Sequence, residues 1–238
     1  MPARFYTDIN LNQTFSNNIL LVVSEKLFHH IITVRRFRIG EHLVLFNGNG
    51  IDYLCQINSK AKKKLQVKLL EKIETKSELS QNIHLYFALT ANKSMDFTIQ
   101  KSVELGVKHL TPIICEYSQY LPKNKISSRL IHWQAIAISA LEQCGRNCII
   151  NLNIPIKFSE LPFQNTLAAD FEGEDINCWL NKNKFQNLSN INLVVGPEGG
   201  FSKSEKEMLK LNFQIVNLGK NILRSETAAI YLISKVIY

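Results

Sequence analysis

The sequence predicts an α/β protein with two parts: a small β-rich, barrel-like domain, then a larger domain whose parallel sheet is covered by helices on both faces. Two observations predict this. The first 75 residues alternate short apolar strands with turn residues, and beyond the polar segment 75–82 apolar strands alternate with amphipathic helices. We therefore expect one domain over residues 1–75 and the other over residues 76–238.

The β-rich domain is predicted from its turns and its alternating strands. Asn47–Gly50 is a strong turn signal between apolar segments at His42–Phe46 and Ile51–Ile57. A further strand is expected at Leu65–Ile73, where apolar side chains alternate. One helix is expected to interrupt the strands, capped by Ser24 and with an apolar stripe formed by Leu27, Phe28, Ile31 and Ile32.

The larger domain is predicted from strand–helix alternation. Apolar segments typical of buried parallel strands occur at Ile83–Leu89, Val107–Cys115, Thr166–Phe171, Ile191–Val195 and Phe213–Leu218. Helices are expected at Ser94–Leu105, at Ser127–Cys144, after Ser202 and at Thr227–Ile237. Gly106 and Gly145 are expected to end the first two helices, and Ser202 with Glu205 forms a capping box.

The composition is that of an ordinary globular protein. Of the 238 residues, 45% are hydrophobic and 20% are charged. No apolar run reaches the roughly 18 residues that a membrane span needs, and residues 1–8 lack the apolar core of a signal peptide. We therefore expect no membrane association and a cytoplasmic location.

Basic residues are concentrated in the smaller domain. The chain has a net charge of +8 and a pI near 9.2. Residues 1–75 carry a net charge of +5, and the much longer remainder carries +3. This density predicts contacts with the phosphates of a polyanion. The expected contact residues are Arg35, Arg36, Arg38, Lys62 and Lys63, although a solvated turn is the alternative for the lysines.

The cysteines and histidines predict neither a metal site nor a disulfide. Five cysteines are an odd number with no CxxC pair, and the six histidines lack zinc spacing. We expect no metal and treat the cysteines as free thiols.

Two glycine-containing segments carry the strongest functional signal. Gly196–Ser202 follows the strand that ends at Val195, and Leu218–Ala229 follows the next strand and leads into the last helix. Ligands bind beyond the carboxyl ends of parallel strands, and glycines let the backbone approach them closely. The two segments therefore predict one ligand cleft. Taken singly, each segment could also be only a tight turn or a helix cap. Neither segment matches the P-loop or the GxGxxG motif.

Taken together, these two segments resemble the signature of the SPOUT class of methyltransferases. Further segments are similar to one branch of that class, the 16S ribosomal RNA uridine-N3 methyltransferases. Lys93–Val107 looks like the first helix of that family, and Trp133–Ala137 with Glu142–Arg146 looks like the second. Residues 1–75 correspond to its PUA-like RNA-binding domain, so the resemblance covers nearly the whole chain.

The resemblance implies a trefoil knot in the C-terminal domain, S-adenosylmethionine as the cofactor, and a homodimer. It implies as substrate a uridine near the decoding region of 16S rRNA, within the small ribosomal subunit. In the family, a third cofactor loop follows the strand that corresponds to Leu167–Phe171. Because that loop varies between members, the resemblance gives Asp170 no role, and we expect the acidic residues that follow it to be solvated. The implied cofactor-binding residues are Gly196, Pro197, Glu198, Gly199, Gly200, Leu218, Gly219, Ile222, Leu223, Thr227 and Ala228.

Methylation of a uracil nitrogen requires alignment and charge stabilisation. Loss of the N3 proton spreads negative charge onto the flanking carbonyl oxygens, and a fixed arginine stabilises that charge. Arg224 is the first catalytic candidate and Arg146 the second, while Glu142 is a weaker candidate for positioning. A structural ion pair is the alternative role for either arginine.

Two alternative functions remain open. One is a SPOUT enzyme that methylates ribose 2′-oxygens, against which the combination of Gln100–Ser102 with Glu142–Arg146 argues. The other is a non-catalytic RNA-binding assembly factor, against which the presence of both cofactor segments argues.

Overall fold

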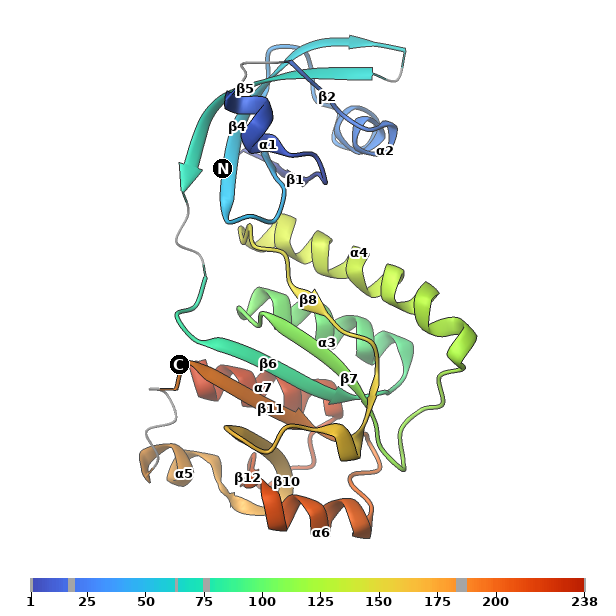
Figure 1. Ribbon diagram of the computed structural model, residues 1–238, viewed down its shortest axis with the longest axis vertical. Coiled ribbons are helices and arrows are strands. Elements are labelled where there is room, and N and C mark those ends of the chain that lie inside the picture. Colours follow the sequence, from blue (N-terminus) through green and yellow to red (C-terminus); the bar gives the residue numbers. More distant parts are fainter. Residues whose placement is uncertain (1, 17–19, 63, 75–77, 183–187, 238) are drawn as a thin grey trace. The chain divides into compact units, whose positions relative to one another are not determined.

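The computed structural model describes residues 2–16, 20–62, 64–74, 78–182 and 188–237 (Figure 1). The chain divides into two compact units. The first unit comprises Met1–Glu78 with Leu141–Ile149, and the second comprises Leu79–Ala140 with Ile150–Tyr238. The domain boundary expected at residue 75 lies outside the described residues. Leu141–Ile149 joins the first unit through contacts between residues far apart in the sequence.

Among the described residues of the first unit, five strands form one sheet in the order β1-β3-β4-β5-β2. Three of them confirm predicted strands, and β1 is an addition that pairs in parallel with β3. Alternation works as expected, because Tyr53, Cys55 and Ile57 of β4 are buried in the core of this unit. The strands are β1 (Arg4–Tyr6), β2 (Leu21–Val22), β3 (His42–Phe46), β4 (Ile51–Ala61) and β5 (Lys64–Glu74).

Short helices cover the core of the first unit. They are α1 (Leu11–Ser16), α2 (Glu25–Phe28) and the π-helix η1 (His29–Val34), which continues directly from α2. The predicted cap is confirmed, since the Ser24 hydroxyl accepts a hydrogen bond of 3.3 Å from the Leu27 N–H.

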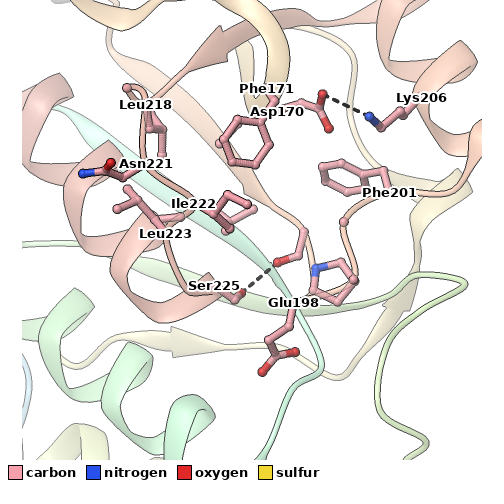
Figure 2. Close-up of a pocket in the computed structure, with 18 residues that line it drawn as sticks. Asp170, Phe171, Glu198, Phe201, Lys206, Leu218, Asn221, Ile222, Leu223 and Ser225 are labelled. Atoms are coloured by element: carbon pink, nitrogen blue, oxygen red, sulfur yellow. Dashed lines mark hydrogen bonds and ion pairs between the residues drawn. The ribbon is translucent and has the colours of Figure 1, made fainter.

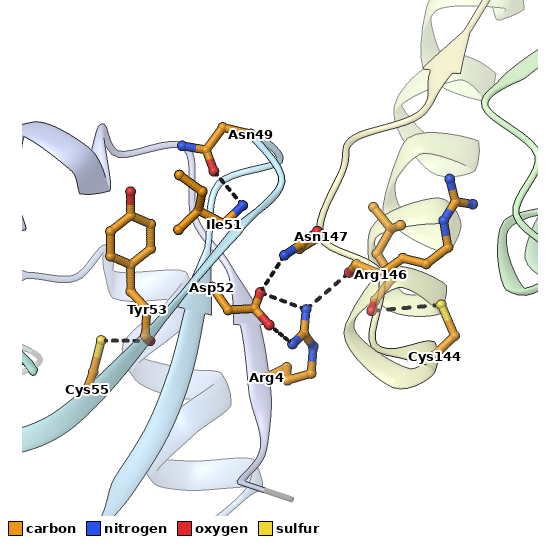
Figure 3. Close-up of polar contacts among 10 residues, drawn as sticks. Arg4, Asn49, Ile51, Asp52, Tyr53, Cys55, Cys144, Arg146 and Asn147 are labelled. Carbon is orange, nitrogen blue, oxygen red and sulfur yellow. Dashed lines mark hydrogen bonds and ion pairs between the residues drawn. The ribbon is translucent and has the colours of Figure 1, made fainter. Parts of the chain in front are cut away.

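A buried polar network joins Leu141–Ile149 to the strands of the first unit (Figure 3). Arg4 forms an ion pair with Asp52, a residue that is only 2% exposed. The Asn147 amide donates to the same carboxylate at 3.2 Å, and Arg4 Nη2 donates to the Arg146 carbonyl at 3.2 Å. Because a buried charge is costly without partners, Asp52 depends on these contacts.

The described strands of the second unit form one parallel sheet in the order β12-β10-β11-β6-β7-β8, with β9 also paired to β7. Ala169 of β10 pairs with Val195 of β11 on one side and with Val216 of β12 on the other, so the β10 bulge begins at the level where β11 and β12 end. The strands are β6 (Asn82–Ala88), β7 (His109–Ile114), β8 (Asn151–Leu152), β9 (Ile156–Lys157), β10 (Thr166–Asp175), β11 (Asn190–Val195) and β12 (Gln214–Asn217).

Helices pack on this sheet as the alternating pattern predicts (Figure 1). α7 contacts α3, β11 and β6. Leu209 and Met208 of α6 pack in a hydrophobic cluster with Tyr86 and Val194 of the sheet. The capping box of α6 is confirmed between Ser202 and Glu205. The helices are α3 (Asn92–Glu104), α4 (Ile126–Cys144), α5 (Ile176–Lys182), α6 (Lys203–Asn212) and α7 (Ser225–Ile237), with short 3₁₀ turns η2 (Lys123–Lys125) and η3 (Phe158–Glu160).

β10 is longer than predicted and carries an irregularity. Its pairing with β12 shifts register between Ala169 and Glu174, so the segment between them bulges out of the ladder. Gly173 lies against β12 so closely that a Cβ there would come within 2.5 Å of the Val216 nitrogen. The polar sequence beyond Phe171 did not predict a strand. This part of β10 pairs with β12, but its side chains are mostly exposed, and exposed strand residues need not be apolar.

Within the described ranges, no helix is both long and apolar enough to cross a membrane, and no group of three or more His, Cys, Asp or Glu side chains is arranged to hold a metal ion.

His84 of β6 makes stability depend on pH. Its ring stacks on Tyr86 at 4.0 Å, and its Nε2 lies 2.7 Å from the Thr111 hydroxyl. Burial, with a contribution from His109, lowers the pKa of His84 to about 4. The unfolded chain therefore binds this proton more readily between pH 6.5 and 4, so the contribution of neutral His84 to stability is complete above about pH 6.5 and falls as the pH falls.

We predict that His84→Gln flattens the pH dependence of the free energy of unfolding between pH 7 and pH 5 by about 2 kcal/mol. Urea titrations at a series of pH values measure this difference. His42→Gln is the matched control, because His42 is exposed. If the His84 and His42 variants have the same pH dependence as the natural chain, His84 is not the group responsible.

Candidate functional site

A cleft of about 340 Å³ opens beyond the carboxyl ends of β10, β11 and β12 (Figure 2). Its walls are the loop after β11, the loop after β12 and the first residues of the β10 bulge. This is the edge at which open parallel sheets bind ligands, and the volume suits a small molecule. The ligand cleft predicted from the two glycine-containing segments is therefore present in the second unit.

The loop after β11 is a turn that specifically needs glycine. The Gly200 N–H donates to the Pro197 carbonyl at 2.9 Å, and Gly200 has φ of +73°, a conformation that other residues rarely adopt. At Gly196 a Cβ would approach the Phe201 ring to 3.0 Å. The absence of side chains here leaves backbone atoms lining the cleft.

The loop after β12 is held against the other two walls. The Ser225 hydroxyl donates to the Gly196 carbonyl at 2.8 Å, which joins this loop to the loop after β11. Asn217 makes two further contacts. Its side-chain oxygen accepts from the Gly219 N–H at 2.8 Å, and its amide donates to the Phe171 carbonyl of the β10 bulge at 2.9 Å.

The cleft is apolar at one end and charged at the other. Leu218, Ile222 and Leu223 gather at the first end, and the Asp170 and Lys206 side chains face one another at the other end (Figure 2). The Lys206 ammonium lies 3.5 Å from Asp170 Oδ1. Such a site accepts a ligand with a flat apolar group at one end and polar or charged groups at the other.

Every residue expected at the cofactor site lines this cleft except Thr227, which is exposed on α7. Thr227 belongs to the segment that resembles the family, and its position in the first turn of α7 suits a structural role in that helix. Its role toward a cofactor stays a prediction.

Several lining residues were not predicted. A signal existed for Phe201, Asn221 and Ser225, which lie inside the two glycine-containing segments. The others depend on contacts between distant parts of the chain: the β10 bulge brings three of them, and α6 supplies a lysine. The additional lining residues are Ala169, Asp170, Phe171, Val195, Phe201, Lys206, Asn221 and Ser225.

The acidic residues after Phe171 are exposed as expected, but they belong to β10 and not to a loop, and Glu172 and Glu174 are paired with lysines. Glu172 lies 2.8 Å from the Lys206 ammonium and 2.6 Å from the Lys210 ammonium. Hydrogen bonds from these two lysines lower the pKa of Glu172 to about 2, and the hydrogen bond to Glu172 raises the pKa of Lys206. Lys206 is therefore positively charged at neutral pH.

Arg224 precedes α7 beside the cleft and is exposed. In the part of the chain that the structure describes, its guanidinium has no ionic partner, so the geometry gives no support to the alternative of a structural ion pair. Arg224 does not line the cavity itself.

The other two catalytic candidates, Arg146 and Glu142, belong to the first unit. Arg146 is 4% exposed and forms two hydrogen bonds with the Glu78 carboxylate, at 2.8 Å and 2.7 Å. Glu142 accepts from the Tyr6 N–H at 2.9 Å, and burial raises its pKa against the opposing effects of that bond and of nearby basic groups. These contacts support structural roles, and catalytic roles for both residues stay predictions.

The expected RNA-contacting arginines are exposed in the first unit. Arg35 ends the π-helix η1, Arg36 has φ of +59°, and Arg38 follows two residues later. Lys62 is exposed at the tip of the β4–β5 hairpin, and Lys63 lies outside the described residues.

The fold and the cleft together define a class: an α/β enzyme with a ligand site at the carboxyl ends of parallel strands, linked to a small β-rich unit. Two family models match in the same order. Residues 23–70 match an RNA methyltransferase PUA domain, and residues 77–237 match an RNA methyltransferase domain.

Relatives match over nearly the whole chain. Ribosomal RNA small subunit methyltransferase E from Buchnera aphidicola (subspecies Acyrthosiphon pisum) is 32% identical over 95% of this chain and 88% of its own length. The protein of that name from Mesomycoplasma hyopneumoniae is 33% identical over 91% of this chain and 93% of its own. The chain belongs to the RNA methyltransferase family.

Solved structures that are similar to this chain are also methyltransferases. A methyltransferase from Legionella pneumophila, in complex with the cofactor SAM, is 31% identical, with a TM-score of 0.89 over 99% of this chain and 97% of that one. Ribosomal RNA small subunit methyltransferase E from Neisseria gonorrhoeae, bound to S-adenosyl methionine, is also 31% identical, with a TM-score of 0.86 over 98% and 96%. The predicted fold class is confirmed, and the trefoil knot stays a prediction.

We predict that Ser225→Ala lowers the free energy of unfolding by about 1–3 kcal/mol, because it leaves the Gly196 carbonyl without the donor that joins the two loops. Urea unfolding measures the loss. Ser128→Ala is the matched control: it removes a 2.9 Å hydroxyl–carbonyl bond at an exposed site and should change stability by no more than about 0.5 kcal/mol. Equal effects of the two substitutions would contradict a special role for the Ser225 bond.

Proposed function

We propose that this chain methylates N3 of a uridine in the decoding region of 16S rRNA, with S-adenosylmethionine as the methyl donor and the small ribosomal subunit as the substrate. The observation that carries the proposal is the cleft at the ends of β10, β11 and β12, in a chain that matches small-subunit rRNA methyltransferases over nearly its full length. The homodimer implied by the resemblance and the cytoplasmic location expected from the sequence are part of the same proposal.

The residues of the cleft fit the proposed cofactor. The apolar end, with Leu218, Ile222 and Leu223, suits an adenine ring, and the glycine loop after β11 offers backbone groups at close range. Among the described residues, the lining includes one cationic side chain, Lys206, and that lysine is paired with carboxylates, so the lining itself presents no uncompensated positive charge to a sulfonium. When bound, S-adenosylmethionine supplies a methyl group carried on that sulfonium.

Arg224 is assigned the stabilisation of charge on the uracil. As N3 loses its proton, negative charge develops on the adjacent carbonyl oxygens, and a guanidinium held nearby stabilises it. Two features support this assignment: Arg224 directly precedes the cleft residue Ser225, and no described carboxylate occupies its guanidinium. The proton acceptor is not among the residues assigned.

We assign RNA binding to the first unit. Arg35, Arg36 and Arg38 form an exposed basic segment at the end of a π-helix, suited to phosphate contacts. N3 is on the pairing edge of uracil, so the target base must be unpaired or drawn out of its stack before it reaches the cleft.

The product of the reaction tests the proposal. Small subunits that lack the modification are incubated with the protein and S-adenosylmethionine, and their RNA is then digested and mapped by mass spectrometry. The proposal predicts one added methyl group on a uracil base of 16S rRNA. A methylated ribose would show the 2′-oxygen alternative instead, and RNA binding without any methylation would favour a non-catalytic assembly factor.

Arg224→Ala should reduce turnover by about 10²–10³-fold, because it removes a donor that acts on the developing charge. S-adenosylmethionine binding, measured by calorimetry, should be unchanged. Lys220→Ala is the matched control: it removes one exposed positive charge from the same loop and should retain full turnover. If Arg224→Ala is as active as the control, Arg224 has no catalytic role.

The double substitution Arg35→Ala and Arg36→Ala should weaken RNA binding and reduce the slope of log K against log[salt] by about 1.5, as expected when two phosphate contacts are lost. Binding isotherms from 50 to 300 mM salt would measure the slope. Replacing the exposed Lys123 and Lys125 of η2 by alanine controls for net charge. An unaltered slope in the arginine variant would mean that these arginines do not contact RNA.

A further inference from the structure

The segment between β7 and η2 places a tyrosine against the loop after β11. A Cβ at Gly199 would lie only 3.1 Å from the Tyr117 Cβ and 3.5 Å from its Cγ. Gly199 does not have the positive φ of Gly200, so the close approach of Tyr117 is the reason that a side chain is not accommodated there. Gly199 lines the cleft and Tyr117 does not, so Tyr117 lies beside the cleft wall and outside the cleft.

Hydrogen bonds fix the turn that carries Tyr117. The Cys115 N–H donates to the Ser118 hydroxyl at 2.9 Å, and the Ser118 N–H donates back to the Cys115 carbonyl at 3.1 Å. On the other side of the tyrosine, the Gln119 N–H donates to the Leu89 carbonyl at 2.8 Å. The backbone on both sides of Tyr117 is therefore held in place.

The Tyr117 ring is exposed although its position is fixed. Tyr117 is 54% exposed, whereas Phe201, which packs against Gly196 of the same loop, is 5% exposed. A buried ring such as that of Phe201 stabilises the fold by its packing. An exposed ring on a fixed turn leaves one face available to another planar group. Tyr117 therefore presents an aromatic surface next to the cleft.

The groups around this loop indicate what that surface would bind. The Ser225 hydroxyl donates to Gly196 of the loop, and Arg224 directly precedes Ser225. Arg224 and Tyr117 thus belong to two segments that both contact the loop after β11. An unstacked nucleobase suits both side chains, because its face stacks on an aromatic ring and its carbonyl oxygens accept from a guanidinium.

We propose that Tyr117 stacks on the target uracil once that base has left its own stack, and so holds N3 at the mouth of the cleft. This inference rests on the proposed function, because it names a residue for the same substrate. Drawing a base out of its stack costs free energy, and stacking on a protein ring offsets part of that cost. Tyr117 is a positioning residue that takes no part in the transfer of the proton or the methyl group.

Two substitutions separate stacking on the base from packing against the loop. The Tyr117 atoms nearest to the Cβ position of Gly199 are Cβ, Cγ and Cδ2, and leucine keeps these three atoms without a ring. Tyr117→Leu therefore removes the stacking surface and retains the contact with the loop, whereas Tyr117→Phe keeps the ring. Tyr120→Leu is the matched control, because Tyr120 is 87% exposed on the same segment. Melting temperatures are compared, and Tyr117→Met takes the place of Tyr117→Leu if the latter is destabilised.

Rates of methylation of small subunits that lack the modification, at saturating S-adenosylmethionine, give kcat/KM for each variant. Tyr117→Leu should lower kcat/KM by about 5- to 100-fold, the effect of losing one base–aromatic stack. Tyr117→Phe and Tyr120→Leu should keep the natural value. Calorimetry should show natural S-adenosylmethionine affinity in all three variants, because Tyr117 does not line the cleft.

Three results would overturn the assignment of Tyr117: natural kcat/KM in Tyr117→Leu, an equal loss in Tyr117→Phe or Tyr120→Leu, or a parallel loss of S-adenosylmethionine affinity. The failure of the proposed function gives a different result. If the natural chain does not methylate a uracil of the small subunit, that function is wrong and the assignment of Tyr117 is wrong with it.

Discussion

The parallel register of β10, β11 and β12 is the constraint on which the cleft depends. Ala169 pairs with both Val195 and Val216, so the β10 bulge and the loops after β11 and β12 begin at one level and on one edge of the sheet. If one of these strands ran the other way, its loop would lie at the opposite edge. The Ser225–Gly196 hydrogen bond then fixes the distance between two of the loops. Gly200 is required because of its positive φ, and Gly196 is required because Phe201 packs where its side chain would lie.

Much of this architecture could be predicted from the sequence, because it follows from local rules. Buried parallel strands appear as apolar runs, and the Ser202–Glu205 box and the Ser24 cap are short-range patterns. The features that were missed depend on tertiary contacts. Asp170 and Lys206 resemble surface charges in the sequence, and only the β10 bulge and the packing of α6 bring them to the cleft. In the sequence, Asp52 looks like an exposed strand residue, because its partners Arg4 and Asn147 are far from it along the chain.

The two units deal with charge in different ways. In the first unit, carboxylates that are buried or half-buried are held by specific donors, as Asp52 is by Arg4 and Glu78 by Arg146, and three arginines near the end of η1 stay exposed. In the second unit, Lys206 and Lys210 offset the charges of Asp170 and Glu172 at one wall of the cleft. An exposed basic surface suits a polyanion, and a balanced apolar cleft suits a ligand that carries its own positive charge. This division supports the proposal that RNA is gripped by one unit and the methyl donor is held by the other.

The most direct test of the account is a crystal structure of the protein with S-adenosylhomocysteine. The account predicts density for the ligand in the cleft between the loops after β11 and β12, with the adenine against Leu218, Ile222 and Leu223. Density for the ligand elsewhere on the chain would contradict the assignment of the cleft.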